Sequence, residues 1–70
     1  MYSYFMTQRP PMPGAMPRDG LVDIEEYDSR EYRYEIMREA WAKLVYSREL
    51  TRQEMSDYEL VPGTYSGMEV

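Results

Sequence analysis

The chain has 70 residues, with neither Cys nor His, and its 13 acidic against 8 basic side chains give a formal net charge of −5. Disulfides are therefore impossible and a zinc site would depend on carboxylates alone, which removes two of the usual supports of so small a fold. With one Lys and dispersed Arg side chains, the chain also lacks the basic cluster that neutralises nucleic-acid phosphates, so we expect no direct nucleic-acid binding.

A chain of this length suffices for one domain, which would bury only about 60% of the surface that the unfolded chain exposes. We expect this domain at residues 1–62, followed by a flexible tail at 63–70. No run approaches the roughly 18 apolar residues of a membrane span, and Met1–Met6 lacks the basic region of an export signal. Because the absence of Cys also suits a reducing compartment, a cytoplasmic protein without membrane contact is predicted.

The first part of the chain predicts two short strands separated by a stiff loop. Aromatic side chains alternate weakly over Tyr2–Thr7, which is typical of a strand. Residues 9–18 contain four of the five prolines and predict an extended connector, with a proline-rich ligand for an aromatic groove as the alternative. Apolar and acidic side chains alternate over Leu21–Tyr27, which predicts a second strand, ended by Asp28 and Ser29.

Residues 29–46 fit two structures. As a helix, they place apolar side chains at i, i+3, i+4, i+7 and i+8, and no Gly or Pro interrupts the segment. Asp28 and Glu31 have the spacing of a capping box in front of such a helix. As a strand, Trp41–Tyr46 places alternate side chains on opposite faces. Periodicity alone favours the helix.

The last predicted element is a short helix at about Arg52–Glu59. Thr51 and Glu54 have the spacing of a capping box, in which side chains satisfy free amides at a helix start. Pro62 and Gly63 would end the helix. The residues expected to pack inward are Leu50, Met55, Tyr58 and Leu60.

The segments TQRPPMPGAMP, DSREYRYEI, AWAKLVYSRELT and EMSDYELVP, in this order, resemble a family of short proteins carried on bacterial mobile elements and phages. The resemblance covers about Tyr4–Pro62 and implies no catalytic residues. It also implies that Gly or Pro often stands in relatives where this chain has Met37, Glu39 and Ala42, which does not suit one long helix.

The predicted fold class is therefore α+β, with a small antiparallel sheet of about three short strands covered by one short C-terminal helix. Ser29–Glu39 is expected to form a loop or a short helical turn, and Trp41–Tyr46 the third strand. Because the residues at positions 37, 39 and 42 are good helix formers here, a long central helix at 29–46 with a short second helix is the alternative.

Catalytic side chains are scarce, so we expect no enzyme, no cofactor and no metal. His, the commonest general acid or base, and Cys, the best nucleophile, are both absent. Glu25 and Glu26 are adjacent, but neighbours on a strand point to opposite faces and do not form a facing carboxylate pair. The four glycines are isolated from one another, so nothing resembles a phosphate loop.

Residues 19–28 contain five carboxylates and no basic residue. On a strand, Asp23 and Glu25 would project from one face about 6.6 Å apart, close to the spacing of successive backbone phosphates. The residues that would extend this negative field are Glu26, Asp28 and Glu31. Such an array would imitate nucleic acid and occupy a basic groove, whereas the plain interpretation is that the carboxylates keep a small protein soluble.

Aromatic residues are the second signal, with 8 Tyr, one Trp and one Phe. Large rings supply burial in a thin core, but one small core cannot hide all of them. Tyr27, Tyr32 and Tyr34 are interleaved with charged residues, which suits a surface that buries rings while it pairs charges. We therefore predict that they anchor a contact with a partner.

Together these features predict a non-enzymatic acidic protein of a mobile element that binds a basic protein surface, as an anti-CRISPR inhibitor of a nucleic-acid-guided defence nuclease would. The alternative is a self-associating accessory protein that buries its exposed rings in a homo-oligomer. A DNA-binding regulator is less consistent with the charge balance. The predicted partner-binding residues are Asp23, Glu25, Glu26, Tyr27, Asp28, Glu31, Tyr32 and Tyr34.

Overall fold

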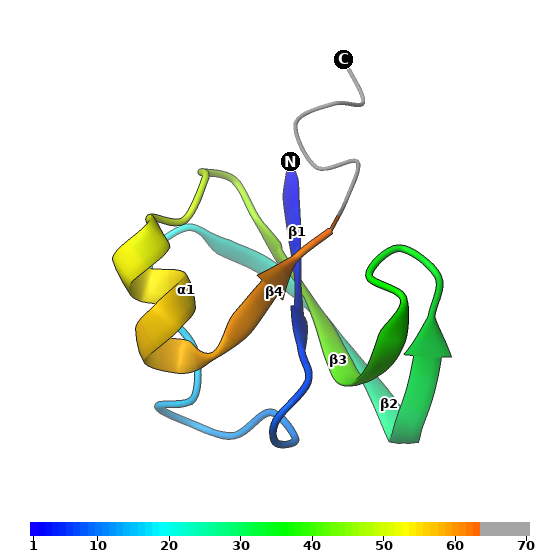
Figure 1. The fold of residues 1–70 in the computed structure, drawn as a ribbon. Coiled ribbons are helices and arrows are strands. Elements are labelled where there is room, and N and C mark those ends of the chain that lie inside the picture. The colour runs from blue at the N-terminus through cyan, green and yellow to red at the C-terminus, as the bar shows by residue number, and fades with distance from the viewer. Residues whose placement is uncertain (64–70) are drawn as a thin grey trace.

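The computed structural model describes residues 1–63, which form one antiparallel sheet and one short helix (Figure 1). The elements are β1 (Tyr2–Met6), β2 (Leu21–Arg33), β3 (Arg38–Tyr46), α1 (Arg52–Tyr58) and β4 (Leu60–Pro62). The strands lie in the order β2-β3-β1-β4. About 48% of the described residues are in strands and 11% in the helix. The predicted α+β class with about three short strands was therefore wrong, because the structure is mostly sheet and has four strands.

Strand β2 is much longer than predicted, and its added residues account for much of the strand content that was not predicted. Asp28 and Ser29, which were expected to end it, lie within it, and the strand continues to Arg33. Pairing with β3 resumes at Glu31 and supplies hydrogen-bond partners for the backbone. That pairing outweighs the local turn preference of two residues.

Strand β3 shows burial with a period of two instead of a helical stripe. Because β1 and β2 flank it, its backbone finds partners on both sides, and this pairing excludes the alternative helix at 29–46, which was wrong. The strand predicted at Trp41–Tyr46 is confirmed. The loop predicted at Ser29–Glu39 is confined to a turn at residues 34–37. The buried side chains of β3 are Ala40, Ala42, Leu44 and Tyr46.

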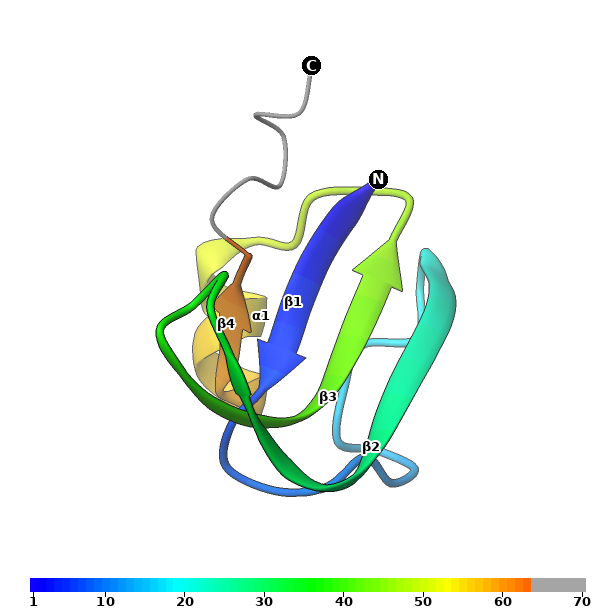
Figure 2. The same ribbon diagram turned by 90° about the vertical axis from the view of Figure 1, so that its right-hand side faces the viewer.

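The sheet has a hydrophobic core on each face because side chains alternate along β1. Tyr4 and Met6 belong to one buried cluster, together with Leu44 and Tyr46. Phe5 points to the other face, where it is fully buried in a second cluster. Helix α1 covers the first face, and the outer end of the β2–β3 hairpin lies on the opposite side of the sheet (Figures 1 and 2).

The outer end of the hairpin folds over the second face of the sheet. The pairing of β2 with β3 shifts register between Leu21 and Asp23 and again between Glu26 and Glu31. Such bulges bend a strand and increase its twist. Beyond the second bulge the hairpin swings across β1 and β4 (Figure 2). We call residues 27–39 the hairpin arm.

Helix α1 begins at the predicted capping box. The Glu54 N–H donates to Thr51 Oγ1 (3.1 Å), and the Thr51 N–H donates to the Glu54 carboxylate (2.9 Å). Arg48 donates two further hydrogen bonds, of 2.9 and 2.8 Å, to this carboxylate. Its Nε also donates to the carbonyl of Asp19 (2.9 Å). Arg48 therefore connects the start of α1 to the chain that enters β2.

The short helix predicted at about Arg52–Glu59 is confirmed at Arg52–Tyr58, but the residues predicted to end it were wrong. Glu59 closes it in a left-handed conformation (φ 55°). The next residues pair with β1 as β4, so Pro62 and Gly63 do not end the helix. All four residues that were predicted to pack inward contact the core, where Leu50 and Leu60 are buried and Met55 and Tyr58 are partly buried.

Acid is expected to destabilise the fold through Glu54. The hydrogen bonds from Arg48, followed by that from the Thr51 N–H, lower the pKa of the Glu54 carboxyl from 4.5 to about 2. A carboxyl with a lowered pKa in the folded state stabilises the fold above pH 4.5, and this contribution is lost as the pH falls towards 2. The midpoint of urea unfolding should therefore fall over this range, and Glu54→Gln should flatten part of the fall. Arg48→Gln removes the same contact from the other side and should flatten it as well, whereas an unchanged slope in both variants would contradict this role.

The proline-rich loop packs against the first core. The Tyr46 hydroxyl donates to the carbonyl of Pro17 (2.6 Å), and Ala15 and Met16 are buried. Burial raises the pKa of Tyr46 to about 12, so its hydroxyl is a neutral donor at physiological pH. As predicted, residues 9–18 form neither helix nor strand.

No helix within residues 1–63 is long and apolar enough to cross a membrane. The flexible tail predicted at 63–70 lies outside the described residues, except for Gly63. That residue is buried, and its N–H donates to the carbonyl of Ser3 (2.9 Å).

Candidate partner-binding surface

Strand β2 carries most of the predicted site and lies at an edge of the sheet. Its strand partner within residues 1–63 is β3, so the other side of its backbone faces outward. Tyr27 is buried, and Tyr34 is exposed on the turn that follows the strand. The remaining predicted residues are exposed along β2 itself: Asp23, Glu25, Glu26, Asp28, Glu31 and Tyr32.

Two carboxylates of this region have a counter-charge, one from a distant part of the sequence and one from a near neighbour. A carboxylate oxygen of Asp19 lies 3.4 Å from Arg48 Nε, and one of Glu31 lies 3.4 Å from Arg33 Nη1. The other four carboxylates form no ion pair within the described residues. We call these four residues the acidic edge: Asp23, Glu25, Glu26 and Asp28.

The acidic edge is not a regular row of charges. Asp23 to Glu26 pair in register with β3, so Asp23 and Glu25 share one face and Glu26 lies on the other. Glu25 lies opposite Lys43 of β3, and Asp28 lies in the second bulge. A spacing like that of phosphates is therefore confined to one pair of carboxylates.

Tyr27 lies in the interior of the hairpin arm. It is 8% exposed and packs in the second core cluster with Phe5 and Ala40. The guanidinium of Arg33 lies 5.1 Å from the centre of its ring and forms an ion pair with Glu35 (3.3 Å). Burial raises the pKa of the Tyr27 hydroxyl. Within the described chain, Tyr27 Oη and Arg33 Nε are buried without a hydrogen-bond partner. Tyr27 therefore supports the fold of the arm and does not present a ring to a partner.

Apolar side chains are exposed at the end of the arm. Tyr34 is 81% and Met37 72% exposed. The rings of Tyr32 and Tyr34 meet edge to face with centres 5.1 Å apart, and the Tyr32 hydroxyl lies 4.0 Å from the sulfur of Met37. We call Tyr32, Tyr34 and Met37 the tip patch. Met37 was missed as a surface residue because its position also fits the apolar stripe of a helix.

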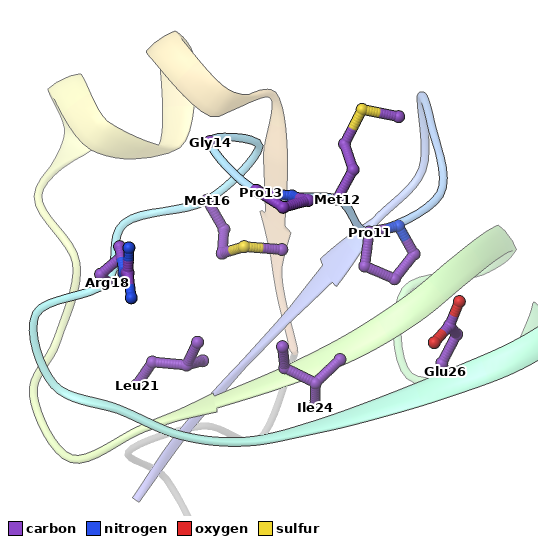
Figure 3. A pocket seen from close by; sticks show the side chains of 9 residues that line it. All are labelled: Pro11, Met12, Pro13, Gly14, Met16, Arg18, Leu21, Ile24 and Glu26. Atoms are coloured by element: carbon purple, nitrogen blue, oxygen red, sulfur yellow. The ribbon is translucent and has the colours of Figure 1, made fainter.

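An apolar groove of about 490 Å³ lies between β2 and the proline-rich loop (Figure 3). Its charged lining residues are Arg18 and Glu26, which lie at its two ends (Figure 3). The groove was not predicted, because nothing in residues 9–18 indicates that the loop returns beside β2. The remaining lining residues are Pro11, Met12, Pro13, Gly14, Met16, Leu21 and Ile24.

The carboxylates of residues 1–63 do not gather into a metal site. No group of three or more Asp or Glu side chains there could hold a metal ion, and the chain has no His or Cys. The features of this surface are thus unpaired carboxylates, exposed rings and an apolar groove, which are suited to contact with another macromolecule.

The family model described as defence against restriction A, C-terminal, matches residues 1–64. The chain belongs to this family. Neither a curated protein nor a solved structure matches the chain. The match confirms in part the resemblance to proteins of mobile elements and phages, since it covers a similar range and the family is linked to such elements, but it does not test the individual motifs.

The range matched by the defence against restriction A C-terminal family includes the acidic edge, the tip patch and the groove. The family description names a process, restriction, and assigns no residue to it. The family description therefore assigns no role to any of these three surfaces.

Proposed function

We propose that this chain is a non-enzymatic binding protein that serves defence against restriction by occupying a basic surface of a host nuclease. The observation that carries the proposal is the acidic edge, four exposed carboxylates without an ion pair within residues 1–63, in a member of this family. Nucleases hold DNA on basic surfaces, and a negative strand edge is attracted to such surfaces. Occupation of the surface by the acidic edge would exclude the DNA.

The family description bears on the class of nuclease that we propose as the target. Its wording favours a restriction nuclease over the nucleic-acid-guided nuclease that an anti-CRISPR protein would inhibit. Both classes hold DNA in positively charged channels or grooves, so the charge of the acidic edge does not distinguish them. Purified nucleases of both classes therefore belong in the test.

Neutralising the acidic edge is expected to weaken nuclease binding at least about tenfold, because electrostatic attraction raises association rates by about 10 to 10³. The variant carries Asp23→Asn, Glu25→Gln, Glu26→Gln and Asp28→Asn. Binding and inhibition of DNA cleavage are measured with each purified nuclease at about 0.1 M salt, where charges within about 10 Å still interact.

A matched control distinguishes the effect of the position of the charges on binding from the effect of the net charge. Glu26→Gln with Asp28→Asn removes two charges from the acidic edge, and Glu49→Gln with Asp57→Asn removes two charges from exposed positions outside it. The first pair should weaken binding and the second should not. Equal losses in both pairs, or no loss with all four edge substitutions, would show that the acidic edge is not the contact.

A second candidate function is self-association, which the tip patch favours. Tyr34 and Met37 are the most exposed apolar side chains of the hairpin arm, and large exposed apolar side chains that lie together often mark an interface. A homo-oligomer that buries this patch would be detected by light scattering. A monomer at high concentration would count against it and would leave the nuclease contact unaffected.

A further inference from the structure

The outward side of β2 between its two bulges is a regular strand edge. Asp23 to Glu26 pair in register with Val45 to Ala42 of β3, and their other side meets no strand within residues 1–63. Such an edge offers backbone N–H and C=O groups to an additional strand. Charges and bulges commonly protect an edge from unwanted pairing, and β2 has both. Its side chains therefore determine which strand can approach.

An apolar side chain beside this edge favours binding over protection alone. Ile24 is 40% exposed, although an edge that is only protected would carry a charge at such a position. Ile24 lines the groove opposite Met12 and Met16 of the proline-rich loop (Figure 3). Because side chains alternate along a strand, an extended segment paired with β2 would place every second side chain at the groove.

The charges along the edge select a basic segment. Asp23 and Glu25 lie on the face away from the groove, Glu26 borders it, and none of the three has an ion pair in the described part of the chain. A second copy of this chain would bring one acidic edge against another, and like charges on paired strands are destabilising. Basic side chains would instead give Asp23 and Glu25 their counter-charges.

We infer that Asp23–Glu26 binds an extended segment of a partner protein as an additional strand, with basic side chains facing Asp23 and Glu25 and apolar side chains entering the groove. The inference rests on the proposed function, because it names the part of the nuclease that the acidic edge contacts. That part is a loop or terminus in which basic and apolar residues alternate. The backbone of β2 supplies the affinity, and the groove and the carboxylates supply the specificity.

Two peptides test the alternation directly. The probe is a blocked peptide in which Lys and Val alternate, and the control has the same composition with all Lys residues grouped at one end. The alternating peptide should bind the full chain and slow hydrogen exchange at the backbone amides of residues 21–26. The grouped peptide should bind about tenfold more weakly, because it cannot place its Val side chains on one face.

Two variants of the chain test the groove. Ile24→Ser should weaken binding of the alternating peptide about tenfold, since it removes apolar contact area. Val22→Ser makes the same kind of change at an exposed position of β2 that does not line the groove, and should leave the affinity unchanged. Both positions are exposed enough for the fold to be retained, which circular dichroism would verify.

Equal affinities for the two peptides, or slowed exchange at the tip patch instead of β2, would overturn the inference. Its failure is distinguishable from failure of the proposed function. If the edge substitutions abolish nuclease binding while Ile24→Ser leaves it intact, strand addition is wrong and the charge contact stands. If the peptide pairs with β2 as expected but the edge substitutions leave nuclease binding unchanged, the proposed function alone fails.

Discussion

Replacing Phe5 by Ala is expected to lower the free energy of unfolding by about 3–5 kcal/mol. Phe5 is fully buried on the second face of the sheet, where it packs with Tyr27 and Ala40 and joins β1 to the hairpin arm. The substitution would leave a cavity between β1 and the hairpin arm. Because small domains have a total stability of only about 5–15 kcal/mol, urea unfolding should show a large drop in midpoint.

The matched control for Phe5→Ala is Tyr34→Ala, which also removes an aromatic ring. Tyr34 is 81% exposed, so its loss should change stability by less than about 0.5 kcal/mol. Similar losses from the two substitutions would contradict the packing of the hairpin arm on Phe5. A large loss from Phe5→Ala alone would show that the second core forms in solution.

The second large effect is expected from Gly20→Ala, which should cost more than Gly14→Ala. Both glycines have a φ of 84°, so both substitutions carry the left-handed strain of about 1–2 kcal/mol. A Cβ at Gly14 would have no atom within 4 Å, whereas one at Gly20 would lie 3.0 Å from Cγ of Arg48. Gly20→Ala therefore also requires Arg48, which holds the Glu54 carboxylate, to shift by a few tenths of an ångström.

The difference between these two glycine variants isolates the role of Arg48. A shift of Arg48 weakens the strongest influence on the pKa of Glu54, so Gly20→Ala should also flatten part of the loss of stability between pH 4.5 and about 2. Gly14→Ala should keep the slope of the unsubstituted chain. Urea unfolding at several pH values measures both quantities, and equal behaviour of the two variants would refute the contact.

The parts of the fold that could be predicted have local signals. The capping box places Thr51 and Glu54 three residues apart, so the start of α1 can be recognised without knowing what surrounds it. The alternation in β1 and at the start of β2 is local in the same sense. Residues 29–46 are different, because their side chains suit a helix as well as a strand, and the choice depends on β1, which lies far away in the sequence. Long-range pairing overrides local preference there.

The candidate surface could be predicted only where charge and exposure follow from composition. The acidic run of β2 is visible in the sequence, but the pairing of Asp19 with Arg48 depends on how the chain returns after β3. The burial of Tyr27 depends on the bulges that turn the hairpin arm over Phe5. The groove requires the proline-rich loop to lie beside β2, and no periodicity indicates that arrangement.

The central position of β1 affects how the chain folds during translation. Residues 2–6 leave the ribosome before the other strands of the domain, yet one side of β1 pairs with β3 and the other with β4, where Tyr4 lies opposite Pro62. The nascent chain must therefore keep Phe5 and its neighbours without partners until most of the domain has been synthesised. Pairing between such distant segments slows folding and exposes apolar strand edges to aggregation meanwhile. Refolding of the chain should accordingly be slow for a domain of this size.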